Sequence, residues 1–214
     1  MRFIDRPDAG RQLAARLNAF ANRRDVVVLA LPRGGVPVAA EVSRALNVPF
    51  DIFVVRKVGV PGHPELAMGA LASGGVRVLS QELIDELGIP LAIVEQVTAR
   101  ERAELERRDR LYRGDRPMPD FAGRTAIVID DGLATGSTME AAVLALRAHA
   151  PARVVVAVPV GARETCERLA RIADEVVCAQ TPAPFNAVGL WYERFDQVSD
   201  DEVISVVSRQ SSVD

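Results

Sequence analysis

The sequence predicts an α/β fold in which a parallel β-sheet is flanked by helices. The first observation is a series of short, continuous apolar runs rich in β-branched residues, typical of strands that are buried on both faces of a sheet. The second is their spacing, because segments with helical periodicity lie between most of these runs. The third is that no apolar run approaches the ~20 residues of a membrane-spanning helix. Such an alternation favours right-handed crossovers between parallel strands.

The expected elements can be given in chain order. Apolar runs predict six strands: Val26–Leu31, Ile52–Val55, Val76–Leu79, Ala126–Ile129, Val154–Val158 and Glu175–Cys178. Helical periodicity predicts four helices: Asp8–Asn22, Pro37–Leu46, Ser137–His149 and Arg163–Ile172. Two capping boxes mark helix starts: Ser137 with Glu140, and Ser199 with Glu202.

Residues 80–113 interrupt this alternation, since they contain no strand pattern. They predict a short helix to Leu87, a break at Gly88–Pro90 and then a long charged helix. Glu and Arg three and four residues apart support a solvent-exposed helix. We therefore expect an inserted helical hairpin, which either is purely structural or forms the contact of a homodimer.

Composition limits the class of protein. A chain of 214 residues, 49% hydrophobic, can bury one sizeable core, so we expect residues 1–214 to form a single domain. The net charge of −3 gives no reason to expect nucleic acid or an anionic membrane as a partner. Two cysteines are too few for a disulfide framework, and the N-terminus lacks the apolar core of a signal peptide. These features favour a cytoplasmic protein.

Ligands of an open α/β sheet bind beyond the carboxyl ends of its strands, so the loops that follow the strands are the candidate sites. The first loop follows Val26–Leu31 and reads Pro32, Arg33, Gly34, Gly35. Two glycines would let backbone amides approach an anion, and Arg33 would add a positive charge. The alternative is a tight turn before a helix, with no ligand.

The second loop follows Ile52–Val55 and opens on two cations, Arg56 and Lys57. Lys57 is the only lysine among 26 basic residues. A lysine here would place a compact charge where a guanidinium fits less well. Coding bias explains the preference for arginine at the other positions equally well. His63 and Glu65 follow among glycines and prolines. This pattern indicates a candidate lid or a surface loop capped by two charges.

The third loop lies in the stretch AIVIDDGLATGSTMEAA, residues 126–142. Two acids, Asp130 and Asp131, follow four apolar residues and precede a loop of small and hydroxyl residues before a helix. The free N–H groups of such a loop and the positive helix end bind phosphate. The two acids would then bind sugar hydroxyls or a hydrated Mg²⁺, whereas the alternative is that they cap a helix. A ribose 5-phosphate presents both groups. The predicted phosphate-binding residues are Ala134, Thr135, Gly136, Ser137 and Thr138.

The segment IVIDDGLATGSTM resembles the phosphoribosyl-pyrophosphate (PRPP) motif of the type I phosphoribosyltransferases. The loop Pro32–Gly35 resembles their pyrophosphate loop. The pair Arg56–Lys57 resembles the strand end that opens the flexible catalytic loop of the orotate and adenine enzymes. Two departures stand out: Gly132 occupies a position that is more often aliphatic, and the second loop lacks a further lysine.

The resemblance implies a type I phosphoribosyltransferase fold with Mg²⁺ as cofactor and PRPP as substrate. The implied reaction transfers the 5-phosphoribosyl group to a nitrogen acceptor, a nucleobase-like heterocycle, and releases pyrophosphate. The implied catalytic residues are Arg33, Arg56, Lys57, Asp130 and Asp131, the last two also holding the metal largely through water. The implied substrate-binding residues are Gly34, Gly35, His63, Glu65 and the phosphate-binding residues 134–138.

The chain ends resemble those of a bacterial branch of this family rather than the purine or pyrimidine enzymes. They imply a small hood, with a C-terminal segment at about residues 180–214. Trp191 and Tyr192 lie in this segment and either contact the acceptor or form an apolar cap over the sheet edge. The alternative function is that of a non-catalytic regulator, which has the same fold and senses PRPP or a nucleotide. A subunit of the ribose-phosphate pyrophosphokinase type is disfavoured, because the chain is short for two tandem domains.

Overall fold

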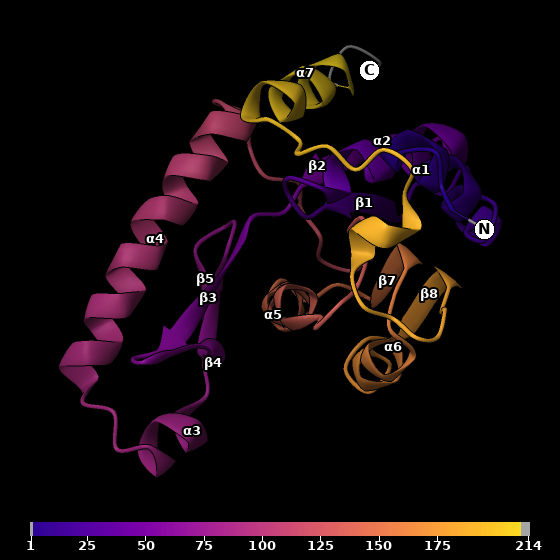
Figure 1. Ribbon diagram of the computed structural model, residues 1–214. Helices are drawn as coiled ribbons and strands as arrows, with labels where there is room; N and C mark the ends of the chain where they lie inside the picture. Colours follow the sequence, from indigo (N-terminus) through magenta and orange to yellow (C-terminus); the bar gives the residue numbers. More distant parts are fainter. Residues whose placement is uncertain (1, 211–214) are drawn as a thin grey trace.

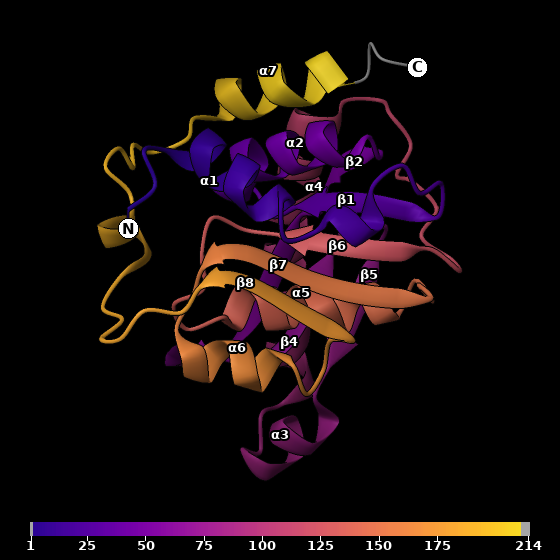
Figure 2. The ribbon, with the colours of Figure 1, turned by 90° about the vertical axis from the view of Figure 1, so that its right-hand side faces the viewer.

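The computed structural model describes residues 2–210, without the side chains of residues 64, 65 and 210. Its centre is a five-stranded parallel sheet, which confirms the predicted parallel sheet, although the predicted strand Val76–Leu79 does not belong to it (Figures 1 and 2). In spatial order the strands are β2 (Phe50–Ile52), β1 (Val26–Ala30), β6 (Thr125–Ile129), β7 (Arg153–Val160) and β8 (Glu175–Gln180).

Helices cover both faces of this sheet. Figure 2 shows α1 (Arg6–Ala14) and α2 (Gly35–Leu46) on one face, with α5 (Ser137–Arg147) and α6 (Arg163–Leu169) on the other. Alternate residues of β1 belong to different cores: Val28 packs with the first helix pair and Leu29 with the second, and both are fully buried. This two-sided burial explains the continuous apolar runs.

The segment after β2 corrects two expectations. The run Ile52–Val55 is not one strand, because the chain leaves the main sheet after β2 and begins a second sheet at β3 (Val55–Val60). The expected loop is instead the hairpin of β3 with β4 (His63–Ala72), and β5 (Val76–Leu79) completes this antiparallel sheet. A run of small residues is typical of a loop in the sequence, but in a sheet the same residues allow neighbouring strands to approach closely. A Cβ on Gly69 would lie 2.4 Å from the Val78 carbonyl oxygen.

The insertion contains the two expected helices, α3 (Gln81–Glu86) and α4 (Leu91–Arg113). They do not form a simple exposed hairpin: α3 contacts β4, whereas α4 packs along β3 and β4 and reaches α7 (Asp200–Gln210), as Figure 1 shows. One stripe of α4 is buried. Its members recur at helical spacing: Val94, Thr98, Glu101, Leu105 and Tyr112. The expectation of a solvent-exposed helix is therefore wrong for this face.

The two ends of the chain pair with each other, as the expected hood requires. After β8 the chain forms a short 3₁₀ helix, Val188–Trp191, and then runs parallel to Phe3. The N–H of Phe3 donates to the Trp191 carbonyl at 2.9 Å, and the N–H of Glu193 donates to the Phe3 carbonyl at 2.8 Å. We call residues 2–5 together with residues 181–199 the hood.

Helix boundaries test the two expected capping boxes. Ser199 and Glu202 form one, with reciprocal bonds of 2.7 and 3.1 Å at the start of α7. The other is wrong, because Gly136 is the N-cap of α5 and Glu140 pairs with Arg168. In the first helix, α1 ends at Ala14, and a separate 3₁₀ turn follows at Asn18–Phe20. Among residues 2–210, no helix combines the length and apolar character that crossing a membrane requires.

Candidate active site

The loops after β1 and β6 meet, because these strands are neighbours in the parallel sheet. The N–H of Leu31 donates to the Ile129 carbonyl at 2.9 Å. A Cβ on Gly34 would lie 2.1 Å from Asp131 Oδ2, and one on Gly35 would lie 2.5 Å from the Ile129 carbonyl oxygen. Glycine is therefore required at both positions by close approach. The N–H of Gly35 is already engaged, at 3.1 Å from the Leu31 carbonyl oxygen, so it is not available to an anion.

Asp130 and Asp131 are half-buried and have different partners. Asp130 Oδ1 accepts from the Asp131 N–H at 2.8 Å, whereas Asp131 Oδ2 accepts from Nε of Arg6 at 2.8 Å. Burial, followed by the charge of Asp131, raises the pKa of Asp130 well above its usual range. Burial also raises the pKa of Asp131, although Arg6 opposes this shift. Neither acid caps α5, whose N-cap is Gly136.

The predicted phosphate loop, residues 134–138, accepts two hydrogen bonds from α6. Thr165 Oγ1 donates to the Ala134 carbonyl at 2.6 Å, and the guanidinium of Arg168 donates to the Thr135 carbonyl. Within residues 2–210, the N–H groups from Ala134 to Met139 donate to no protein acceptor. The loop therefore presents unpaired N–H groups at the positive end of an 11-residue helix, which is the usual arrangement for binding an anion.

The structure explains the unusual glycine after the acid pair. A Cβ on Gly132 would lie 2.5 Å from Val188 Cγ1 and 3.1 Å from the Val160 carbonyl oxygen. The 3₁₀ helix of the hood occupies the space that an aliphatic side chain would need. Gly132 therefore adapts the motif to this hood.

Arg56 and Lys57 lie on β3, and with Thr138 they line one cavity of about 500 Å³. The structure thus brings the cationic pair to the helix end of the phosphate loop. Arg56 is already paired, since its Nε lies 2.9 Å from Oε2 of Glu101, a buried residue of α4.

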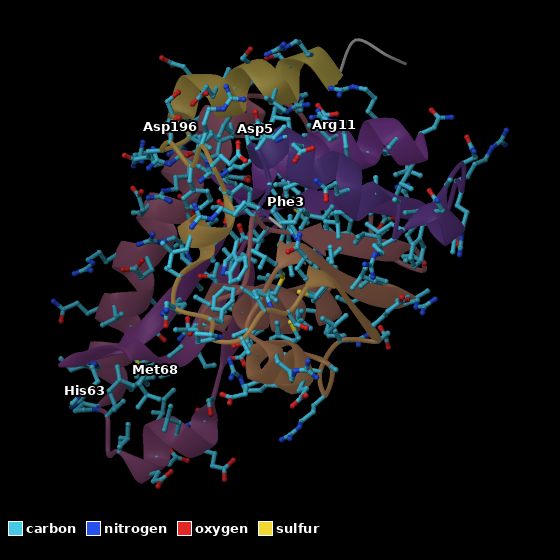
Figure 3. The ribbon with its side chains drawn as sticks, turned by 45° about the vertical axis from the view of Figure 1, so that its right-hand side comes forward. Phe3, Asp5, Arg11, His63, Met68 and Asp196 are labelled. Carbon is cyan, nitrogen blue, oxygen red and sulfur yellow. The ribbon has the colours of Figure 1, made fainter. Side chains whose placement is uncertain are left out.

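The structure places two other predicted residues elsewhere. His63 begins β4, is exposed and pairs with Val60 at the hairpin turn. In Figure 3 it lies far from Phe3 and Asp5, which mark the hood side. The structure therefore does not bring His63 to the acid pair. Glu65 also lies on β4, but its side chain is outside the described part of the chain.

Arg33 points toward the first residue of α7. Its Nη1 lies 3.7 Å from Oδ1 of Asp200, which also accepts from the Tyr112 hydroxyl at 2.5 Å. About a third of the Arg33 side chain is exposed. The bond from Pro32 to Arg33 is a cis peptide.

The two aromatic residues predicted near the acceptor differ in exposure. Tyr192 is buried, and its ring centroid lies 5.4 Å from that of Phe3 and 4.8 Å from that of Phe195. Its hydroxyl donates to the Asp131 carbonyl at 2.6 Å. Trp191 is half-buried, and its indole Nε1 has no hydrogen-bond partner among the described residues. Tyr192 thus supports the acid pair, while Trp191 retains an unpaired donor.

Sequence reasoning missed two residues of this site, Arg6 and Glu101. Arg6 is the first residue of α1, where the positive helix end disfavours a cation, and this conflict is a signal that could have identified it. Glu101 occupies a buried position on the apolar stripe of α4. A charged residue at such a position is unusual, and this conflict could have identified it.

Comparisons with known proteins agree with this arrangement. Residues 5–74 and 65–194 match the model of the phosphoribosyl transferase domain. "Putative phosphoribosyl transferase Rv0571c" of Mycobacterium tuberculosis H37Rv is 49% identical over 207 residues, which are 97% of this chain and 46% of that protein. Its counterpart in strain CDC 1551 matches equally. The chain thus spans about half the length of the curated relatives it matches. The crystal structure of TT1426 from Thermus thermophilus has a TM-score of 0.89 and 44% identity, over 98% of this chain and 99% of that one.

Proposed function

Because the chain belongs to the phosphoribosyl transferase domain family, we propose that it transfers the 5-phosphoribosyl group of PRPP to a nitrogen acceptor and releases pyrophosphate. One observation carries this proposal: Asp131 of the acid pair lies against the Gly34 turn, and the pair is followed directly in the chain by the loop whose N–H groups, residues 134–139, are unpaired. A ligand that fits this site has sugar hydroxyls between two phosphate groups, as PRPP has. We treat residues 1–214 as one catalytic unit, because both chain ends build the hood.

Each part of the ligand has a protein partner in this proposal. The 5-phosphate would accept from the N–H groups of the phosphate loop, and the ribose hydroxyls would donate to Asp130 and Asp131. The departing pyrophosphate would lie near Arg33, the Gly34 N–H and Lys57. Catalysis would come from positioning and from stabilising the charge that develops on the leaving group.

The acid pair fits Mg²⁺, because carboxylate oxygens are the hard donors that this ion prefers. Among the side chains that the structure describes, which exclude that of Glu65, no group of three or more His, Cys, Asp or Glu could hold a metal by itself. Asp130 and Asp131 would therefore hold the ion together with water and substrate oxygens. When bound, Mg²⁺ would neutralise charge on the pyrophosphate.

We expect PRPP to bind at least tenfold more weakly when Mg²⁺ is removed. Two carboxylates beside a polyanionic ligand repel it unless a cation lies between them. Calorimetry with Mg²⁺ and with EDTA measures the difference. Equal affinities would show that the acid pair does not meet the ligand through a metal.

Turnover is tested by pyrophosphate release from PRPP and Mg²⁺ in the presence of a panel of nucleobases and related nitrogen heterocycles. We propose that the acceptor lies under the hood and contacts Trp191, the only tryptophan of the chain. A heterocycle that stacks on its ring would change its fluorescence. The base that releases pyrophosphate should therefore also change the fluorescence of the protein loaded with Mg²⁺ and PRPP.

Replacing Lys57 by alanine is expected to lower kcat about tenfold or more and to change PRPP affinity less. A cation near the leaving group gains most when charge develops there, which is at the transition state. Steady-state kinetics and calorimetry separate the two quantities. Arg100→Ala is the matched control, because Arg100 lines the same cavity with a largely exposed side chain. A rise in KM with unchanged kcat would exclude the leaving-group role.

A regulator that binds PRPP without turning it over is the second candidate. One observation favours it: Arg56, one of the cations predicted to stabilise the leaving group, is paired with Glu101. The base panel distinguishes the two functions. PRPP binding without pyrophosphate release for any base would support the regulator.

A further inference from the structure

The side chain of Arg6 connects the acid pair to the hood. Its Nε donates to Asp131 Oδ2 at 2.8 Å, and its Nη1 donates to the Asp196 carbonyl at 2.6 Å. Its Cζ lies 3.9 Å from the ring centroid of Phe195. Only 11% of the side chain is exposed. One guanidinium therefore contacts a carboxylate of the candidate site and two residues of the hood.

Stability alone does not explain this placement. Arg6 is the first residue of α1, where the N-terminal end of the helix is positive and disfavours a cation. Burying an arginine and a carboxylate also removes both from water, and well-packed apolar residues often stabilise such a position as well or better. The arrangement therefore has a cost that a role in the site would explain.

The contacts of Asp131 indicate what this role is. Its Oδ2 is held by Arg6 and lies against the backbone of Gly34, so this oxygen is not available to a ligand. The other oxygen, Oδ1, accepts from no N–H group among the described residues, and the carboxyl of Asp130 lies within hydrogen-bonding reach of the Asp131 carboxyl. Arg6 thereby determines which carboxylate oxygen a ligand meets. Within the same residues, no basic side chain forms an ion pair with Asp130.

We propose that Arg6 is a positioning residue for the ribose of PRPP: it holds Asp131 so that Oδ1 accepts a ribose hydroxyl, and it ties this orientation to the hood over the acceptor. This inference rests on the proposed function. It predicts that Arg6 matters for ligands that contain ribose and not for pyrophosphate alone. Comparing PRPP with inorganic pyrophosphate on the same variant therefore tests whether Arg6 acts on the ribose.

The test measures the binding of Mg²⁺ with PRPP and of Mg²⁺ with inorganic pyrophosphate by calorimetry. For Arg6→Gln we expect PRPP affinity to fall at least tenfold, while pyrophosphate affinity stays within about twofold of the wild type. Arg11→Gln is the matched control, because Arg11 lies on the same helix with an exposed side chain and only long ion pairs to Asp8 and Glu41. It should bind both ligands as the wild type does. The double variant Arg6→Gln with Asp131→Asn should lose less PRPP affinity than the two single losses combined, since both changes remove the Arg6–Asp131 pair.

The outcomes separate the inference from the proposed function. Unchanged PRPP affinity in Arg6→Gln, or an equal loss for both ligands, would overturn the positioning role while leaving the function in place. A wild-type protein that does not bind PRPP would overturn the function and the inference together. If Arg6→Gln does not fold, Arg6→Lys takes its place in the same assay. A single ammonium cannot span both Asp131 and the Asp196 carbonyl as the guanidinium does, so the same selective loss is expected.

Discussion

Replacing Asp130 by asparagine is expected to weaken the binding of Mg²⁺ with PRPP about 100-fold and, at the same time, to stabilise the fold. The loss follows because the variant lacks a charged acceptor for the metal's waters and the ribose hydroxyls, a change that typically costs 10–100-fold in affinity. The gain follows because the Asp130 carboxylate is half-buried beside Asp131. Asparagine keeps the oxygen that accepts from the Asp131 N–H but carries no charge.

The sign of the stability change follows from the pKa. A carboxyl whose pKa is raised in the folded state contributes fully to stability below its unfolded pKa of about 3.9, and this contribution is lost as the pH rises through the folded pKa. At neutral pH the wild type therefore carries a cost that the asparagine variant lacks. We expect a gain of about 1 kcal/mol, or about 2–4 °C in Tm for a chain of this size.

The adjacent acid provides the control. Asp131→Asn should also weaken PRPP binding, but it should lower the Tm, because the buried Arg6 loses its counter-charge. Thermal unfolding and calorimetry at neutral pH measure both effects. Two neighbouring carboxylates are thus expected to affect binding in the same direction and stability in opposite directions. If both variants bind PRPP as the wild type does, the acid pair is not the ribose site.

The strands of the main sheet could be predicted from sequence because the burial of each strand is visible in its own residues. Each central strand is buried on both faces, so each appears as an uninterrupted apolar run, and the observed β6 and β7 include the predicted runs. The hairpin of β3 and β4 could not be predicted in the same way. Its second strand approaches β5 closely at Gly69 and contains small residues and proline, which also mark loops.

Some features of the candidate site could likewise be predicted from sequence, and others could not. That the loops after β1 and β6 would meet follows from a rule about strand ends, and the structure brings Gly34 to Asp131. The ion pair of Arg6 with Asp131 joins residues 125 positions apart, and no local pattern specifies such a partner. Gly132 was recognised as a departure from the family motif, but its reason, contact with Val188 of the hood, required the structure.

The largest stability effect is expected outside the site, at the buried ion pair between Arg113 and Asp51. Arg113 ends α4 and donates to the Asp51 carboxylate and, at 2.9 Å, to the Ile52 carbonyl. Both side chains are almost fully buried. This contact ties the end of the inserted helix to the edge strand of the main sheet. Burial raises the pKa of Asp51 in spite of the opposing charge of Arg113, so the carboxylate depends on its partner.

Replacing Arg113 by alanine should therefore lower the free energy of unfolding by about 3–5 kcal/mol at neutral pH, because the Asp51 charge stays buried without a partner. The loss should shrink as the pH falls, since protonation neutralises Asp51. Denaturant unfolding at several pH values measures this dependence.

Arg110→Ala is the matched control, because Arg110 is exposed near the end of α4 and should change stability by less than about 0.5 kcal/mol. Adding Asp51→Asn to Arg113→Ala removes the orphaned charge but keeps the oxygen that accepts from the Ile52 N–H, so it should recover part of the loss. A loss that does not depend on pH, and that Asp51→Asn does not reduce, would show that Arg113 stabilises the fold by packing rather than by charge.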